Sequence, residues 1–528
     1  MNAPEMNLTR IRNGINPLTQ TDFYKTGHIA QYEKGTTEVY ANLTARSARL
    51  APVLEGYFDN KVVWFGAQAF ITIYLVELFN REFFGKPKAD VVARYKRRMD
   101  TSPGPDAVDV AHIEALWDLG YLPLEVKALP EGSRVNIRVP VMTLRNTLPE
   151  FYWLTNYIET VLSNELWKPT TVATLAYQYR QLLEDYAERT GGDKAFVDWQ
   201  AHDFSCRGLS GFADSMFTGA AHLLSFTGTD TIAAIDFLED YYLADAEKEL
   251  IGGSVPATEH SVMCLSGEED ELETFRRLIC DVYPSGVVSI VSDSWDFWRV
   301  ITEYARELKP QILARTPNAL GLAKVVFRPD SGDPVKILTG YLPEEVEARG
   351  NGTYEVVGQK GEFITEAERK GAVECLWDIF GGTETAKGYK QLNERVGLIY
   401  GDSITLERAQ AILARLEAKG FASTNVVFGV GSFSYQYLTR DSFGFAVKAT
   451  SGVVNGVRRA VAKNPKTDSG VKKSAVGLLR VEQEGDDFVL YDNQTEEQEK
   501  QGALRTVFLD GKLVVEESLT TIRARLRG

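Results

Sequence analysis

Cysteine is scarce in this sequence, with four residues among 528 and no C-x-x-C pair. A zinc ribbon needs paired thiolates, and a disulfide framework needs several closely spaced cysteines, so the sequence favours neither. We interpret all of them as reduced thiols of a cytoplasmic protein. They are Cys206, Cys264, Cys280 and Cys375.

Long apolar runs are missing as well. The most hydrophobic stretch, residues 62–79, is interrupted by Gln68, Thr72 and Glu77, which favours a buried helix over a membrane span. Residues 1–12 are polar and lack the apolar centre of a secretory signal. We therefore expect a cytoplasmic protein with no membrane segment.

Basic charge is not in excess, because 58 Lys and Arg stand against 73 Asp and Glu, for a net charge of -15. Nucleic acids and anionic membranes bind to broad basic surfaces, so neither is an expected partner. An anionic substrate must be bound by local Arg or Lys side chains. With 44% hydrophobic residues the chain can bury a large core, and its length favours more than one lobe.

Two patterns of secondary structure divide the chain. Residues 18–166 mix amphipathic helices such as 67–79 with short strands at 38–43, 124–128 and 134–139, which is typical of an α+β lobe. From about residue 169, apolar runs alternate with helical patterns, as in the βα units of a parallel sheet or barrel. The clearest runs are 287–291, 324–327, 396–400 and 425–428.

Three further segments complete the expected organisation. Residues 404–419 have the period of a helix, which Gly420 would end. A polar insert at 334–363 should leave the barrel, and residues 452–528 return to short strands that should pack on the N-terminal lobe. We predict an N-terminal lobe (1–168), a barrel carrying the catalytic face (169–440) and a C-terminal segment packed with the N-terminal lobe (441–528).

Small and charged residues follow the predicted barrel strands. The carboxyl ends of barrel strands converge on one face, where active sites lie. Turn formation explains any single ending equally well, but four in succession favour a site that binds phosphate through backbone N–H groups and ribose through carboxylates. The endings are 292–294 (SDS), 328–332 (RPDSG), 401–403 (GDS) and 429–432 (GVGS).

Residues 202–208 (HDFSCRG) end another apolar run. Phe204 can stack on a flat heterocycle, and Arg207 can pair with a phosphate, although a core Phe and a surface Arg are the plainer interpretation. Cys206 is a weak nucleophile candidate because no adjacent base would activate it.

Residues 228–231 (GTDT) lie between two helical segments, where Thr229 or Asp230 could simply cap a helix. His260 follows a proline-containing loop. A lone histidine is more often structural, but the adjacent Glu259 makes a chemical role a candidate.

Taken together, these segments resemble the nicotinamide phosphoribosyltransferase family over nearly the whole chain. The resemblance implies the type II phosphoribosyltransferase fold, an irregular α/β barrel with an added α+β lobe built from both chain termini. It also implies a homodimer with shared active sites. The motifs are 21–25 (TDFYK), 152–156 (YWLTN), 202–204 with 207–208, 228–231, 254–261 (SVPATEHS), 291–294 (VSDS), 328–332, 401–402 and 438–441 (LTRD).

The implied reaction transfers phosphoribosyl from phosphoribosyl pyrophosphate to nicotinamide, giving nicotinamide mononucleotide and pyrophosphate in NAD salvage. Magnesium and ATP are the implied cofactors, and ATP would stimulate the reaction through a phosphohistidine at His260. Nicotinate phosphoribosyltransferase is the alternative. Asp230 argues against it, because a carboxylate favours an amide NH₂ and repels a carboxylate substrate. A phosphate-binding barrel without chemistry and an ATP-dependent phosphotransfer protein are more distant alternatives.

The resemblance also implies roles for single residues. Phe204 would stack on one face of the pyridine ring and Tyr24 of the partner subunit on the other, with Asp230 at the carboxamide and Arg328 and Ser289 lining the pocket. The catalytic group would be His260, Glu259, Asp293 and Asp330. Magnesium would bind through substrate phosphates, with Asp293 and Asp330 as candidate ligands. The phosphoribosyl pyrophosphate and phosphate positions would be Arg207, Arg46, Arg440, Lys448, Gly401, Asp402 and Gly431.

Overall fold

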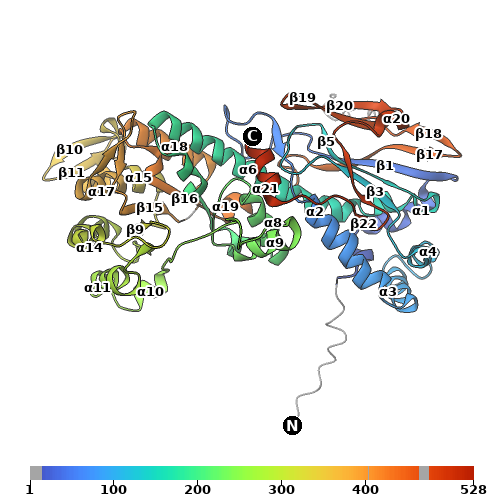
Figure 1. The fold of residues 1–528 in the computed structure, drawn as a ribbon, viewed down its shortest axis with the longest axis horizontal. Helices are drawn as coiled ribbons and strands as arrows, with labels where there is room; N and C mark the ends of the chain where they lie inside the picture. Colours follow the sequence, from blue (N-terminus) through green and yellow to red (C-terminus); the bar gives the residue numbers. More distant parts are fainter. Residues whose placement is uncertain (1–14, 402, 463–474) are drawn as a thin grey trace, which may run out of the picture.

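The computed structural model describes residues 15–401, 403–462 and 475–528, so Asp402 lies outside the described residues. The chain forms two lobes that meet along the long helix α6 (Glu159–Thr190) (Figure 1). The first turns of α6, with Leu162 and Leu166, belong to the core of one lobe. Its later turns, with Leu175 and Leu182, belong to the core of the other. Residue 168, the predicted end of the N-terminal lobe, lies inside this helix. The predicted domain limits stay predictions.

One lobe contains a parallel sheet of six described strands in the order β7-β6-β16-β15-β9-β8. The strand runs predicted at 287–291, 324–327, 396–400 and 425–428 are confirmed as four of these strands. The strands are β6 (Ala201–Asp203), β7 (Gly228–Thr229), β8 (Gly286–Val291), β9 (Ala323–Arg328), β15 (Val396–Tyr400) and β16 (Val426–Val430).

An irregular segment, residues 253–257, closes the gap between the edge strands β7 and β8. Gly253 forms a parallel bridge with Gly228, and Ala257 forms one with Ser289. The backbone N–H of Thr229 donates to Gly253 at 3.0 Å, and that of Ser289 donates to Pro256 at 2.9 Å. The sheet therefore curls into the expected irregular barrel. Because the segment runs parallel to β8, it leads His260 toward the carboxyl ends of the strands.

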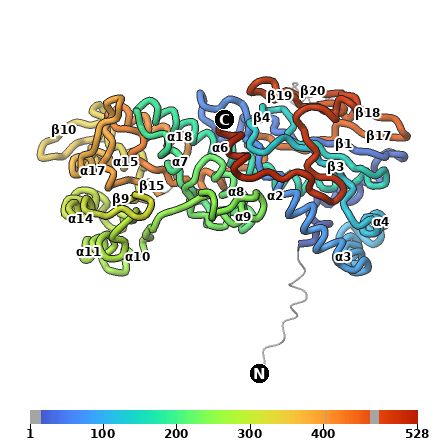
Figure 2. Tube along the Cα trace, viewed as in Figure 1, coloured from blue at the N-terminus to red at the C-terminus, as the bar shows by residue number. Residues whose placement is uncertain are grey.

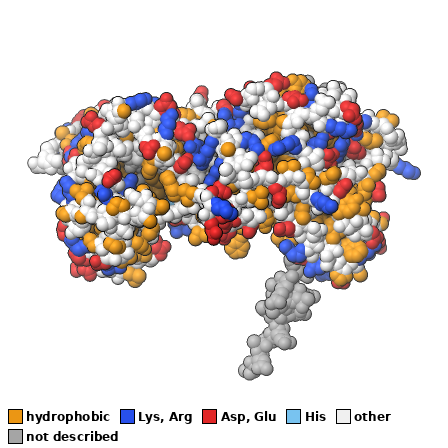
Figure 3. All heavy atoms as spheres, in the orientation of Figure 1, with side chains coloured by type: hydrophobic (Ala, Val, Ile, Leu, Met, Phe, Trp, Pro, Cys, Tyr) orange, Lys and Arg blue, Asp and Glu red, His pale blue; other side chains and the backbone are white. Residues whose placement is uncertain are grey.

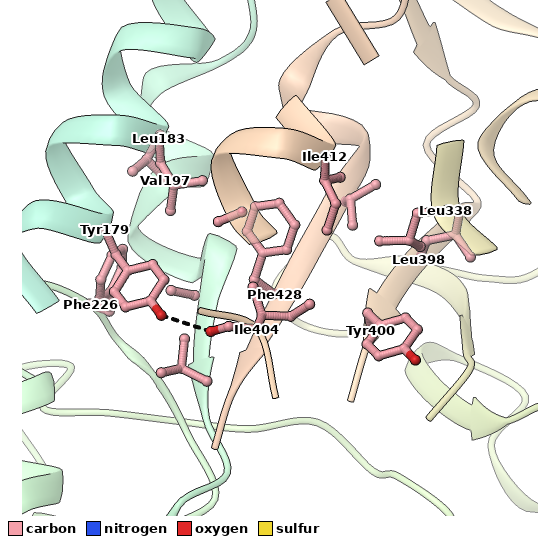
Figure 4. Close-up of a cluster of buried hydrophobic side chains, with 14 of the residues drawn as sticks. Tyr179, Leu183, Val197, Phe226, Leu338, Leu398, Tyr400, Ile404, Ile412 and Phe428 are labelled. Carbon is pink, nitrogen blue, oxygen red and sulfur yellow. Dashed lines mark hydrogen bonds between the residues drawn. The ribbon is translucent and has the colours of Figure 1, made fainter. Parts of the chain in front are cut away.

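Helices cover this barrel, and α18 (Leu406–Ala418) confirms the helix predicted at 404–419. Thr405 caps its N-terminus by accepting from the N–H of Arg408, and Gly420, with φ +76°, follows its last turn. Figure 4 shows the core beneath it, where Phe428 and Ile412 pack near α6. The other covering helices include α8 (Phe212–His222), α9 (Ile232–Tyr242), α15 (Pro334–Thr339) and α17 (Ala372–Phe380).

The polar insert begins later than predicted. Residues 334–339 form α15, which packs against α17 and α18 and so belongs to the barrel. The excursion itself is a small antiparallel sheet. Its strands are β10 (Val346–Gly350), β11 (Thr353–Val356) and β12 (Phe363–Thr365).

The second lobe is built on an antiparallel sheet from both ends of the chain, in the order β18-β17-β1-β5-β3-β21-β22 among the described strands. β1 pairs with β17, and β3 pairs with β21, so this lobe is an α+β lobe of both termini, as predicted. The strands are β1 (Thr36–Thr44), β3 (Leu124–Ala128), β5 (Pro140–Asn146), β17 (Ala446–Val454), β18 (Val457–Ala460), β21 (Arg505–Leu509) and β22 (Lys512–Leu513).

Two details of this lobe differ from expectation. The strand predicted at 134–139 is β4 (Arg134–Asn136), which stops before Arg138 because that residue has φ +75°; β5 then begins as a separate strand. The helix predicted at 67–79 is helical throughout, but after α2 (Ala67–Phe70) it widens into π-helical turns at Ile71–Leu78.

The last helix, α21 (Leu519–Arg527), lies at the centre of the molecule beside α6 (Figure 2). Its buried side chains Leu519, Ile522 and Leu526 pack in the barrel core. The C-terminal strands thus join the antiparallel sheet, whereas the C-terminal helix packs with the barrel.

All four cysteines are unpaired, as predicted. Every helix of the described chain is too short or too polar to cross a membrane. Acidic and basic side chains are interspersed over the face shown in Figure 3.

Candidate active site

The residues predicted from the strand endings lie together at one edge of the parallel barrel. Each ends or follows one of the six barrel strands, and parallel strands end at the same edge. In the strand order of the sheet they are Asp230 (β7), Phe204 (β6), Gly431 (β16), Gly401 (β15), Arg328 and Asp330 (β9) and Asp293 (β8).

His260, the first residue of α10 (His260–Cys264), faces a carboxylate from another strand end. Its Nε2 lies 3.3 Å from Oδ1 of Asp293. The carboxylate of Glu259 instead accepts a hydrogen bond from the Ser261 hydroxyl. The side chain of His260 is 49% exposed and that of Asp293 only 4%, so the imidazole has both a fixed partner and access to solvent.

Hydrogen bonds hold the other oxygen of Asp293 in place. Oδ2 accepts from the backbone N–H of Asp330 at 2.9 Å, and from the backbone N–H and hydroxyl of Ser331 at 2.8 Å and 2.6 Å. Burial by itself raises the pKa of Asp293, but these hydrogen bonds and the nearby His260 outweigh it and lower the pKa below its usual value. Asp293 is thus a fixed negative charge. Ser331 was not among the predicted site residues, although it lies inside the predicted RPDSG motif.

The ends of β9 and β15 are also in contact. Arg328 donates through Nη2 to the carbonyl of Thr258 at 2.5 Å, and its Nε lies 3.6 Å from Oδ1 of Asp330. A Cβ on Gly401 would lie 1.9 Å from the same oxygen of Asp330, so only glycine permits this approach. Ser289 lies on β8, and its hydroxyl is buried without a hydrogen-bond partner in the described chain.

At the end of β7, next to the segment that closes the barrel, Asp230 is held by two neighbours. Its Oδ1 lies 2.9 Å from Nε2 of His202 and accepts from the Ser254 hydroxyl at 2.6 Å. Burial raises the pKa of Asp230, but these contacts more than compensate and lower it. Residue 231, not Asp230, is the N-cap of α9, so helix capping does not explain this carboxylate. The ring of Phe204 lies 4.6 Å from that of His202, centroid to centroid.

Two of the phosphate candidates in the barrel, Arg207 and Gly431, lie on loops that touch. Gly208 follows Arg207, and a Cβ on Gly208 would lie 2.2 Å from Oγ of Ser432, which follows Gly431. The loops after β6 and β16 therefore meet. Arg207 is exposed there.

The remaining predicted site residues do not lie on a barrel strand or directly after one. Tyr24, 61% exposed, precedes α1 (His28–Gln31) in the antiparallel lobe. Arg46 donates to the carbonyl of Gly444 at 2.8 Å, and Lys448 lies on β17. Arg440 is exposed, and in the sequence it lies between β16 of the barrel and β17 of the other lobe. α1 and β17 lie in the lobe away from the barrel strands in Figure 1.

Comparison with known proteins identifies this architecture. The nicotinate phosphoribosyltransferase (NAPRTase) family model matches residues 199–512, and the nicotinamide phosphoribosyltransferase N-terminal domain model matches residues 16–89. The crystal structure of nicotinate-nucleotide pyrophosphorylase from Pyrococcus furiosus superposes with a TM-score of 0.55 at 14% identity, covering 100% of this chain and 97% of that one.

Two curated relatives bear the same protein name. A nicotinamide phosphoribosyltransferase from Acinetobacter baylyi is 60% identical over 512 residues, 97% of each chain. One from Xanthomonas campestris pv. campestris is 32% identical over 516 residues, 96% of this chain and 97% of its own. The barrel, its strand-end site and the lobe from both termini define a type II phosphoribosyltransferase. Within that class, the chain belongs to the nicotinamide phosphoribosyltransferase family.

Proposed function

We propose that this enzyme transfers the phosphoribosyl group of phosphoribosyl pyrophosphate to nicotinamide, giving nicotinamide mononucleotide and pyrophosphate for NAD salvage. The observation that carries the substrate choice is the carboxylate of Asp230 at the end of β7, which His202 and Ser254 hold in place. A carboxylate accepts a hydrogen bond from the amide NH₂ of nicotinamide and repels the carboxylate of nicotinate.

The surroundings of Asp230 suit a flat amide-bearing ring. Phe204, at the end of the neighbouring strand, would stack on the pyridine. The unpartnered hydroxyl of Ser289 and the guanidinium of Arg328 are further polar groups for the same ligand. A buried hydroxyl without a partner costs free energy, which a bound ligand would recover.

The chemical step needs stabilisation of two opposite charges. Arg207 and the backbone at Gly401 and Gly431 would hold the phosphates, while Asp293 and Asp330 would face the cationic ribose that develops as pyrophosphate leaves. Magnesium, bound through the substrate phosphates, would neutralise charge on the leaving group. Oxygen ligands suit it, and Asp293 and Asp330, joined by the 2.9 Å hydrogen bond, offer two carboxylates on adjacent strand ends.

ATP stimulation through a phosphohistidine is the second part of the proposal. His260 combines an exposed ring with a carboxylate partner, Asp293, that would fix its orientation and keep its other nitrogen nucleophilic. In this arrangement Glu259 acts at most through the loop, since its carboxylate is engaged by Ser261.

A homodimer is the third part. Tyr24, Arg46 and Lys448 lie in the antiparallel lobe, so a second copy of the chain would bring them to the barrel edge. Tyr24 of the partner subunit would then cover the pyridine face opposite Phe204, and the exposure of its ring in one chain supports this assignment.

Nicotinate phosphoribosyltransferase activity is the second candidate, favoured by the family model that matches residues 199–512. One assay separates the candidates: phosphoribosyl pyrophosphate and magnesium with either pyridine, with and without ATP, and mononucleotide followed by mass. We expect product from nicotinamide far faster than from nicotinate. Equal rates would overturn the assignment, and ATP turnover independent of both pyridines would indicate a phosphotransfer protein.

A further inference from the structure

The carboxylate of Asp203, the last residue of β6, is fully buried and hydrogen-bonds to two loops at once. Oδ1 accepts from the backbone N–H and the hydroxyl of Ser205, at 2.9 Å and 2.6 Å. Oδ2 accepts from the hydroxyl of Thr231 at 2.7 Å and from that of Thr229 at 3.3 Å. One side chain therefore joins the loop after β6 to the loop after β7.

These two loops carry the substrate contacts of the proposed function. Ser205 lies between Phe204 and Arg207, and Thr229 and Thr231 flank Asp230. The main chain reinforces the link, because the N–H of Asp230 donates to the carbonyl of Asp203 at 3.0 Å. The position of Asp230 relative to Arg207 thus depends on bonds that converge on Asp203.

Burying a carboxylate is costly unless its oxygens are hydrogen-bonded. Both oxygens of Asp203 have donors, and three of the four donor atoms are side-chain hydroxyls on residues adjacent to proposed ligand-binding positions. Charge-assisted hydrogen bonds are the shorter and stronger kind, so this centre holds the two loops in one geometry. A barrel core could fill the same volume with apolar side chains, and stability alone does not require a charge there.

We propose that Asp203 is a positioning residue. By hydrogen-bonding to both loops, it fixes the position of Asp230, which recognises the pyridine, relative to Arg207, which binds a phosphate. The inference rests on the proposed function, in which Asp230 meets the pyridine and Arg207 a phosphate. Asp203 itself touches neither substrate. Among the described residues, Oδ1 of Asp203 accepts only from the loop after β6, and Oδ2 accepts only from β7 and the loop after it. Removing the donors to one oxygen should therefore change phosphate binding or pyridine recognition without changing the other.

The test uses the full-length enzyme and removes hydrogen bonds to one oxygen of Asp203 at a time. Ser205→Ala removes the hydroxyl bond to Oδ1, and we expect the KM for phosphoribosyl pyrophosphate to rise about 3- to 10-fold with the preference for nicotinamide over nicotinate unchanged. Thr231→Val removes a bond to Oδ2, and we expect that preference to fall about 3- to 10-fold with the KM for phosphoribosyl pyrophosphate unchanged. Asp203→Asn should show both effects.

Two variants serve as controls. Thr227→Val, at the other end of β7, also loses a buried hydroxyl bond, here to the carbonyl of Asp198, without contact to Asp203, and should change neither quantity. Thr231→Ser keeps the hydroxyl and should retain the preference. If Asp203→Asn does not fold, the two hydroxyl variants alone decide.

Loss of kcat to the same extent in Ser205→Ala and Thr231→Val, with both KM values and the preference unchanged, would overturn the proposal, since a merely structural role lowers only the active fraction. Failure of the proposed function is a separate result. It would appear in the wild type as absence of nicotinamide mononucleotide, before any variant is compared.

Discussion

Nε2 of His260 lies 3.3 Å from Oδ1 of Asp293, although the two residues belong to different segments of the barrel edge. Asp293 is held in turn by the backbone N–H groups of Asp330 and Ser331. The imidazole is therefore oriented through one nitrogen, and the other nitrogen is left for chemistry.

His260→Ala should abolish stimulation by ATP and leave slow basal synthesis, because phosphoryl transfer needs the imidazole whereas phosphoribosyl transfer does not. Mononucleotide formation with and without ATP measures both quantities. Asp293→Asn should lower stimulation and basal rate together, since in the proposed function Asp293 would also face the ribose. The surface variant Glu269→Gln should behave as the wild type; unchanged ATP stimulation in His260→Ala would refute the phosphohistidine.

Asp230→Ser should relax selectivity toward nicotinate. The change removes the negative charge that the proposed function places beside the pyridine, so the ratio of kcat/KM for nicotinamide to that for nicotinate should fall about 10- to 100-fold. Asp236→Ser, on the exposed face of α9, is the matched control and should keep the wild-type ratio. An unaltered ratio in Asp230→Ser would show that recognition lies elsewhere.

Gly401→Ala should lower kcat/KM about 100-fold with little loss of folded protein, because the new Cβ would displace the carboxylate of Asp330, which in the proposed function faces the ribose. Gly397→Ala is a control within β15, where the Cβ would meet the flexible side chain of Lys324 at 3.0 Å and Val326 at 3.5 Å, an ordinary van der Waals distance. Steady-state kinetics and thermal unfolding of both variants check the prediction. Equal loss of activity in Gly401→Ala and Gly397→Ala would show that distortion of β15, and not displacement of Asp330, lowers the activity.

Hybrid dimers test whether Tyr24 serves the partner's site. Tyr24→Ala and Phe204→Ala homodimers should each have two impaired sites, whereas a hybrid has one doubly altered and one intact site. Dissociation and reassociation of an equal mixture should restore about a quarter of wild-type activity. Activity equal to the mean of the two parents would contradict a shared site.

Glu131 should make stability depend on pH. Burial raises the pKa of the Glu131 carboxyl group from 4.5 to about 7. It does so although the carboxylate accepts hydrogen bonds from the N–H groups of Gly66 and Gln68 and from the hydroxyl of Tyr242. Tyr242 belongs to α9, a helix of the barrel. The folded state therefore binds this proton more tightly than the unfolded chain, and the free energy of unfolding should fall by up to about 3 kcal/mol as pH rises through this window.

The measurement compares thermal midpoints of the wild type and Glu131→Gln from pH 5 to pH 8. The variant should lose less stability than the wild type over this range, because it lacks the titrating group. Glu269→Gln, an exposed control, should follow the wild type. Parallel curves for the wild type and Glu131→Gln would show that Glu131 does not titrate there.

Much of the barrel was predictable because its strands are short apolar runs and its helices have caps that local sequence encodes. β8, β9, β15, β16 and α18 appeared within a few residues of their predicted positions. Turn chemistry also indicated which residues follow the strands. β5 was not predicted, and the strand predicted at 134–139 extended past the end of β4, because the turn there depends on Arg138, a residue type that rarely adopts positive φ.

Sequence by itself determined the strands, their polar endings and the resemblance that placed Asp230, Asp293 and Arg328 in one site. Only the tertiary structure decided which groups face each other. Glu259 is adjacent to His260 in the chain, yet the 3.3 Å partner is Asp293, because segment 253–257 closes the barrel beside β8 and carries His260 to that strand's end. The links from Asp203 to Ser205 and Thr231 arise in the same way, since strand order and register set which side chains meet, and neither is encoded locally.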